Sequence, residues 1–295
     1  MSVKNLGALL LLSALWGGSF LFMRIAVPAL GPVLLIELRF LLAGLALLGY
    51  ALLRRRVPPL RSHWRQYVVI GLVNCAIPPL LISFAELHLP ASLAATLNAT
   101  TALFTSLVAA VWMGEALTLR KTAALLIGFA GVVTLVGLGP LSLTAEALWS
   151  IGASLLASAF YGVAAVYTKV KVQGAQPEGL ALYSQLFSAL WLLPLVPFTL
   201  PAALPSMTVI ISLLMLALLS TSLGFRLYFH LIVDAGPAKA TMVTYLAPAF
   251  GMLWGALFLH ETLSVGFLLG SLLILGSVAV LSPQRRTPSG RIHLT

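Results

Sequence analysis

The stretch NLGALLLLSALWGGSFLFMRIAV, residues 5–27, holds a single charged residue, Arg24. An α-helix needs about 20 mainly apolar residues to cross the hydrocarbon core of a bilayer. A second apolar stretch, residues 33–53, follows almost directly, which distinguishes the first from a cleaved signal peptide. The opening of the chain therefore predicts a transmembrane hairpin.

The rest of the chain has the same character. It is 60% hydrophobic and 8% charged over 295 residues, with a mean hydropathy of +1.06, whereas soluble domains carry about 25% charged residues. Eight further apolar stretches lie at residues 66–87, 91–113, 119–138, 147–169, 179–199, 207–228, 237–258 and 264–282. We therefore expect an all-α membrane protein with ten transmembrane helices and no soluble domain.

The basic residues fix an expected orientation. With the N-terminus in the cytoplasm, fifteen of the seventeen Lys and Arg residues fall at the inner ends of the predicted spans, and the outer loops have none. Basic residues concentrate on the cytoplasmic side of membrane proteins. We expect both termini in the cytoplasm, with residues 285–295 as a basic tail. The bilayer thus accounts for the net charge of +10 without a nucleic-acid partner.

The two halves of the chain resemble each other. GALLLLSALWGG (7–18) aligns with GASLLASAFYGV (152–163) at a shift of 145, and Glu115 aligns with Glu261 at a shift of 146. This predicts two five-helix units, residues 1–140 and 141–284. Because five is odd, the second unit must be inverted in the membrane, and inverted repeats are typical of secondary transporters that work by alternating access.

Short motifs recur in a characteristic order along these spans. They are Trp16, Gly17 and Ser19; Arg39, Phe40, Ala43 and Gly44; Gly114 and Glu115; Tyr245 to Pro248; and His260 and Glu261. In this order they resemble the EamA family of the drug/metabolite transporter superfamily, over essentially the whole chain. The resemblance implies export of small metabolites across a bacterial inner membrane, commonly amino acids, and includes an aromatic amino-acid branch. Ala102 departs from the family pattern. Many members have a proline midway along the fourth span, as Pro248 supplies in the ninth, and Ala102 is the matching position here.

Transporter sites of this kind lie near the midplane between the repeats, beside interrupted helices. The candidates for a central substrate cavity are therefore the polar, aromatic and helix-breaking residues at mid-span: Trp16, Phe20, Arg39, Asn74, Pro78, Asn98, Thr101, Tyr161, Gln185 and Tyr245. Asn98, Thr101 and Thr105 share one helical face by spacing. Pro78 and Pro79 should bend or break their helix.

Several of these candidates keep two readings. Trp16 and its repeat counterpart Tyr161 either form an aromatic pair in the cavity or are packing bulk. Arg39 either meets a substrate carboxylate or binds helix carbonyls, because a charge within a span needs a partner.

Other charged residues lie near the ends of spans. Arg24 and Glu37 are equidistant from the Pro28–Pro32 turn, so we expect an ion pair near the outer surface, holding the hairpin or acting as a gate. Glu86, Glu115 and Glu261 should be solvated or cap helices. Because no carboxylate lies at the midplane, facilitated export is favoured over proton-coupled export.

Glycines mark the fifth and tenth spans. Gly128, Gly131, Gly266 and Gly270 allow helices to approach closely. They predict either packing within the chain or a homodimer through these spans.

The residues do not favour an enzyme. Cys75 is the single cysteine, the five histidines lie in loops or at span ends, and metal-binding or catalytic motifs are absent from the sequence. We expect no metal and no cofactor. The favoured function is export of small amphipathic metabolites, with amino acids first. The alternatives are a multidrug or nucleotide-sugar-type carrier, an intramembrane enzyme acting on lipid-linked substrates, and a channel.

Overall fold

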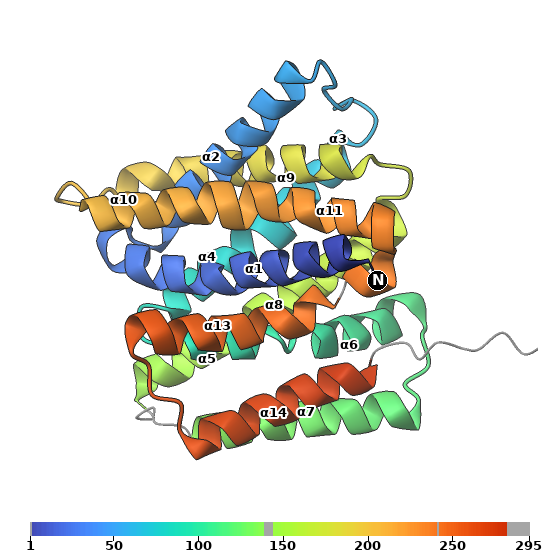
Figure 1. Cartoon of the computed structure of the whole chain (residues 1–295), viewed down its shortest axis with the longest axis vertical. Helices are drawn as coiled ribbons and strands as arrows, with labels where there is room; N and C mark the ends of the chain where they lie inside the picture. The colour runs from blue at the N-terminus through green and yellow to red at the C-terminus, as the bar shows by residue number, and fades with distance from the viewer. Residues whose placement is uncertain (1, 139–143, 241, 282–295) are drawn as a thin grey trace, which may run out of the picture.

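The computed structural model describes residues 2–138, 144–240 and 242–281 (Figure 1), and in these ranges it contains helices and no strands. The helices are α1 (Val3–Leu30), α2 (Pro32–Leu53), α3 (Trp64–Ile70), α4 (Ile77–Ala85), α5 (Ala91–Asn98), α6 (Thr101–Met113), α7 (Leu119–Gly137), α8 (Ala145–Lys171), α9 (Pro177–Leu192), α10 (Met207–Leu214), α11 (Gly224–Ala235), α12 (Pro237–Ala240), α13 (Val243–Leu259) and α14 (Val265–Leu281). Two π-helical segments, η1 (Gly71–Ala76) and η3 (Met215–Leu223), and the 3₁₀ segment η2 (Leu193–Phe198) continue them.

Eight helical segments of the described chain are long and apolar enough to cross a membrane. They are Val3–Leu30, Pro32–Leu53, Trp64–Ala85, Ala91–Met113, Leu119–Gly137, Ala145–Lys171, Pro177–Phe198 and Met207–Ala235. Two shorter apolar helices, Val243–Leu259 and Val265–Leu281, follow them. The predicted all-helical membrane architecture is confirmed.

The first two helices turn sharply at Gly31. Its φ of 72° lies in the left-handed region, which glycine adopts without the steric cost that a Cβ imposes. Pro32 then occupies the first turn of α2, where a missing N–H costs nothing because that N–H has no helical partner. The tight connection brings the ends of α1 and α2 together at one end of the molecule (Figure 1).

The third segment is interrupted where the two prolines predict it. Pro78 and Pro79 lie in the first turn of α4, directly after the π-helix η1. Since proline has no N–H, the carbonyls of Asn74 and Cys75 lose their α-helical donors, and the chain widens before them. Shifted by 145 positions, η1 falls on residues 216–221, inside the second π-helix η3. The two halves thus share an interruption at equivalent places.

The fourth segment is also interrupted, which its sequence did not predict. A short connection, Ala99–Thr100, separates α5 from α6, although the proline expected from the family pattern is replaced by Ala102. The Thr100 hydroxyl donates to the carbonyl oxygen of Leu97 at 2.6 Å. A threonine hydroxyl that binds nearby backbone competes with helix propagation. Asn98 therefore ends one helix, and Thr101 begins the next.

The helices α7 and α14 pack against each other along one edge of the molecule (Figure 1). A Cβ atom at Gly131 would lie under 3.0 Å from Ile274, and Cβ atoms at Gly266 and Gly270 would collide with Leu138 and Leu135. Gly128 faces Leu103 and Ser277 in the same way. The prediction of close packing is confirmed. The four glycines face residues of their own chain, and the homodimer through these spans stays a prediction.

Candidate functional site

Arg39 belongs to α2 and lies where the π-helical segments η1 and η3 pack near that helix. Its Nε donates to Thr221 Oγ1 at 3.0 Å, its Nη1 lies 3.3 Å from Met23 Sδ, and its guanidinium stands 5.1 Å from the centroid of the Phe40 ring. Thr221 is held in η3 by its own hydrogen bond to the carbonyl oxygen of Leu216, at 2.8 Å. Inside the bundle, Arg39 is therefore a cation to which no carboxylate of the described residues is bound.

Three further groups line up beside this cation. Tyr161 of α8, Cys75 of η1 and the buried Glu86 lie within electrostatic range of Arg39. Asn74 Nδ2 is 3.7 Å from Cys75 Sγ, and Cys75 Sγ is 3.8 Å from Ser184 Oγ. Two predicted site residues, Arg39 and Tyr161, thus lie near each other, and a third, Asn74, is linked to them through Cys75. The sequence analysis missed Cys75, Ser184 and Thr221, because hydroxyl and thiol side chains are common in membrane helices and give no periodic signal.

Other predicted site residues carry buried polar atoms without a hydrogen-bond partner. These atoms are Asn98 Oδ1, Thr101 Oγ1 and both amide atoms of Gln185. Gln185 is fully buried on α9. Leaving a buried polar group unpaired costs about 1–3 kcal/mol. Among the described residues, Ser106, Ser154, Ser188 and Ser220 also carry buried hydroxyl groups without a hydrogen-bond partner, so such atoms are spread through the bundle.

The remaining cavity candidates belong to packing clusters. The Trp16 ring lies 6.1 Å from Phe225 and 5.3 Å from Tyr228, centroid to centroid, on α11. Tyr161 packs against a different cluster from Trp16, so within the described residues the two rings do not contact each other.

Phe20 and Pro78 are buried in the core. The Tyr245 hydroxyl donates to the carbonyl oxygen of Val278 at 3.1 Å.

The expected ion pair between Arg24 and Glu37 is wrong. Arg24 Nη1 instead donates to the backbone carbonyl oxygen of Glu86, at the end of α4. Glu37 is buried, and in the described part of the chain the ion pairs within 4.0 Å do not include it. The last carbonyls of a helix lack helical donors and carry partial negative charge, which attracts a guanidinium. Equal distance from the turn gave the depth of Arg24 but not the direction of its side chain.

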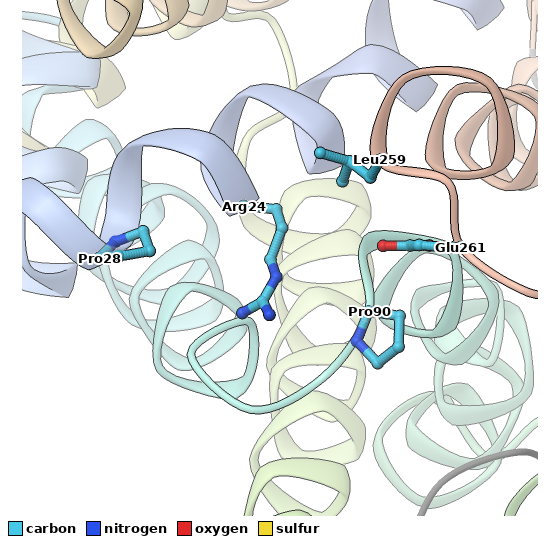
Figure 2. A pocket seen from close by; sticks show the side chains of 5 residues that line it. All are labelled: Arg24, Pro28, Pro90, Leu259 and Glu261. Atoms are coloured by element: carbon cyan, nitrogen blue, oxygen red, sulfur yellow. The ribbon is translucent and has the colours of Figure 1, made fainter. Parts of the chain in front are cut away.

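A pocket of about 360 Å³ opens beside Arg24. Arg24, Pro28, Pro90, Leu259 and Glu261 line it (Figure 2). Glu261 accepts hydrogen bonds from the backbone N–H groups of Ala91, at 2.7 Å, and Ser92, at 2.9 Å, and so caps α5 as the sequence predicts for a span-end carboxylate. Opposite charges thus line one small pocket.

Glu86 departs from its expected solvation. Glu86 is 0% exposed, and within the described ranges neither of its carboxyl oxygens has a hydrogen-bond partner. Arg24 contacts the backbone of this residue and not its carboxyl group.

Glu115, the counterpart of Glu261 in the first half, has a different environment. Its carboxylate binds Lys121 Nζ at 2.9 Å and Lys169 Nζ at 3.2 Å. These hydrogen bonds hold the pKa of the Glu115 carboxyl below its usual value. The group is therefore an ionised partner of two lysines at neutral pH.

A second, smaller pocket of about 180 Å³ lies between α2 and the η3–α11 segment. Tyr50 and Arg226 line it, together with apolar side chains and Ser222. The Arg226 guanidinium stands 3.9 Å from the Tyr50 ring centroid, and its Nη2 donates to the Tyr50 hydroxyl at 3.1 Å. Within the described residues, His, Cys, Asp and Glu side chains form no group of three that could hold a metal ion.

The chain is similar to known transporters along its length. The sequence profile of the EamA-like transporter family matches residues 5–137 and again residues 148–282. The uncharacterized inner membrane transporter YedA of Escherichia coli K12 is 29% identical, covering 88% of this chain and 84% of the relative. The uncharacterized transporter YvbV of Bacillus subtilis 168 is 26% identical, covering 96% and 93%.

Two other similarities concern function and fold. A probable terminal-alkyne amino-acid exporter of Streptantibioticus cattleyicolor is 25% identical, covering 96% of this chain and 94% of the relative. A solved crystal structure superimposes with a TM-score of 0.67 at 19% identity, covering 95% of this chain and 96% of the other. The protein is thus a multi-pass protein of the bacterial inner membrane, and it belongs to the EamA-like transporter family.

Proposed function

We propose that the protein is a secondary transporter that exports small amphipathic metabolites, with neutral and aromatic amino acids first among the substrates. The observation that carries this proposal is the set of residues around Arg39, here called the Arg39 cluster: Arg39, Asn74, Cys75, Tyr161, Ser184 and Thr221. Within the described residues, no carboxylate contacts Arg39; its guanidinium donates to Thr221, and Tyr161, Cys75 and Glu86 lie in electrostatic range, at the place where the π-helices η1 and η3 interrupt two helices. A guanidinium is well suited to bind a carboxylate through two parallel hydrogen bonds.

Other polar atoms supply the remaining contacts of the proposed site. Asn98 Oδ1 and both amide atoms of Gln185 are buried and have no hydrogen-bond partner among the described residues. They suit the ammonium group of an amino acid or polar groups of its side chain. The amino-acid exporter among the relatives supports this substrate class.

We propose that transport proceeds by alternating access. The two matched stretches, 5–137 and 148–282, and the equivalent π-helices η1 and η3 support two repeated five-helix units. In this proposal ten spans cross the membrane, the second unit is inverted, and both termini lie in the cytoplasm. Strongly exposed apolar side chains such as Val111, Leu119 and Trp149 then face lipid.

The test is uptake into proteoliposomes of a radiolabelled panel: aromatic, aliphatic, hydroxyl-bearing and charged amino acids, a nucleotide sugar and a quaternary ammonium drug. Saturable uptake of neutral amino acids is expected from the wild type. Arg39→Gln should lower kcat/KM at least tenfold, as loss of one charge-assisted pair implies. The matched control is Arg226→Gln, which removes an arginine from the smaller pocket and should leave uptake within about twofold.

The other outcomes decide between the remaining functions. Uptake of the drug or the nucleotide sugar alone would assign the protein to another type of carrier in the superfamily. Non-saturable flux would indicate a channel, and a response to an imposed pH gradient would replace facilitated export by proton coupling. Silence across the panel would contradict the transporter proposal.

A further inference from the structure

The pocket beside Arg24 joins the two halves of the chain. Arg24 and Pro28 come from α1, Pro90 precedes α5, and Leu259 and Glu261 end α13 (Figure 2). In the proposed topology this end of the molecule faces the outside. The pocket therefore lies on the exit side of an exporter, at a boundary that alternating access would open and close.

Arg24 is positioned before any ligand binds. One nitrogen, Nη1, is bound to the backbone carbonyl oxygen of Glu86, which leaves the other guanidinium N–H groups for another acceptor. In the described part of the chain, Arg24 has no carboxylate within 4.0 Å, so no protein anion neutralises it by contact.

Glu261 is positioned in the same manner. Two backbone N–H groups at the start of α5 hold its oxygens, one on Oε1 and one on Oε2. An ionised carboxylate has about four lone-pair sites, so both oxygens can accept a further hydrogen bond. In Figure 2, Glu261, Pro90 and Leu259 lie on one side of Arg24 and Pro28 lies on the other.

We propose that this pocket is a second substrate subsite, specific for zwitterionic α-amino acids. The substrate carboxylate binds the Arg24 guanidinium, its ammonium group binds Glu261, and its side chain lies against Leu259 and the two prolines. Two fixed opposite charges favour a molecule that carries both charges over one that carries either alone. The inference rests on the proposed function and extends it, because it places a release site between the Arg39 cluster and the outside.

The test measures equilibrium binding of radiolabelled phenylalanine to the purified full-length protein. The wild type should bind two molecules per chain, and Arg24→Gln and Glu261→Gln should each bind one. Arg24→Lys keeps the cation and should retain two, with affinity at the second site weakened severalfold. Arg226→Gln is the matched control and should also retain two.

A second measurement needs no variant, in case a charge-removing variant fails to fold. Phenylalanine amide lacks the carboxylate and N-acetylphenylalanine lacks the ammonium group. Each should displace phenylalanine from the second site at least tenfold less well than leucine does. Equal displacement by all three compounds, or two molecules bound to Arg24→Gln, would overturn the subsite.

Uptake distinguishes this inference from the proposed function. Wild-type uptake of amino acids, with a stoichiometry of one that Arg24→Gln leaves unchanged, would refute the subsite and leave the transporter intact. Binding that depends on Arg24 in a protein that moves no amino acid would support the subsite and refute export.

Discussion

Glu115 and Glu261 occupy equivalent positions in the two halves, yet they are bound in opposite ways. Glu261 accepts two backbone N–H groups of α5 at 2.7 and 2.9 Å and so connects the second half to the first. Glu115 binds two flexible lysines, and its side chain is 35% exposed. Both carboxylates therefore join the two halves, Glu261 through fixed backbone groups and Glu115 through the long side chain of Lys169 in α8.

The largest expected difference is between two variants that each lack one of these carboxylates, Glu261→Ala and Glu115→Ala. Glu261→Ala should lower the free energy of unfolding by about 2–3 kcal/mol, because two backbone donors lose a charged acceptor. Glu115→Ala should cost less than about 1 kcal/mol, since exposed ion pairs contribute little. Unfolding in mixed micelles titrated with denaturant measures both values, and equal losses would refute the difference between the two ends.

The buried Glu86, near Arg24, gives a second test at the same end of the molecule as Glu261. It is fully buried with both oxygens unpartnered, so its neutral isostere should cost no more than about 1 kcal/mol in Glu86→Gln. Glu86→Lys should prevent correct folding, because it places an ammonium group beside Arg24. The same unfolding assay checks the first variant, and size-exclusion chromatography checks the second. A loss above 2 kcal/mol in Glu86→Gln would show that its carboxyl group has a partner in the folded protein.

The smallest expected effect is the pH dependence of Glu115. Its folded pKa is lowered, so its contribution is present above the unfolded value of about 4.3 and is lost as pH falls through the folded pKa. The difference in unfolding free energy between wild type and Glu115→Gln should be a few tenths of a kcal/mol at pH 7 and should vanish on the acid side of the ordinary carboxyl range. A difference that grows on acidification would have the wrong sign.

The contrast between the two carboxylates also shows how far sequence reasoning reaches. Hydropathy predicted the helical segments, Pro78 and Pro79 predicted the interruption before α4, and glycine spacing predicted the contact between α7 and α14. Each of these features depends on local composition or on the absence of a donor or a side chain. Such features can be read along one chain.

The predictions that were wrong depended on where a side chain points and on what packs around it. Counting from a turn gives the depth of Arg24, but helix rotation decides that it faces the end of α4 and not Glu37. Burial of Glu86 depends on helices distant in sequence, and the break at Ala99–Thr100 depends on a side-chain hydrogen bond. The Arg39 cluster is intermediate: Arg39, Asn74 and Tyr161 were predicted, whereas Cys75, Ser184 and Thr221 required the fold.

The most direct test of the proposed substrate site at Arg39 uses the single cysteine, Cys75. Cys75 is 1% exposed and belongs to the Arg39 cluster. In membrane vesicles, a small membrane-impermeant thiol reagent should label Cys75 slowly, because alternating access opens the cluster to water. A transported amino acid should slow that labelling, and Cys75→Ser should show none. Labelling that requires denaturation, or that proceeds equally with and without the amino acid, would contradict a substrate site at Arg39.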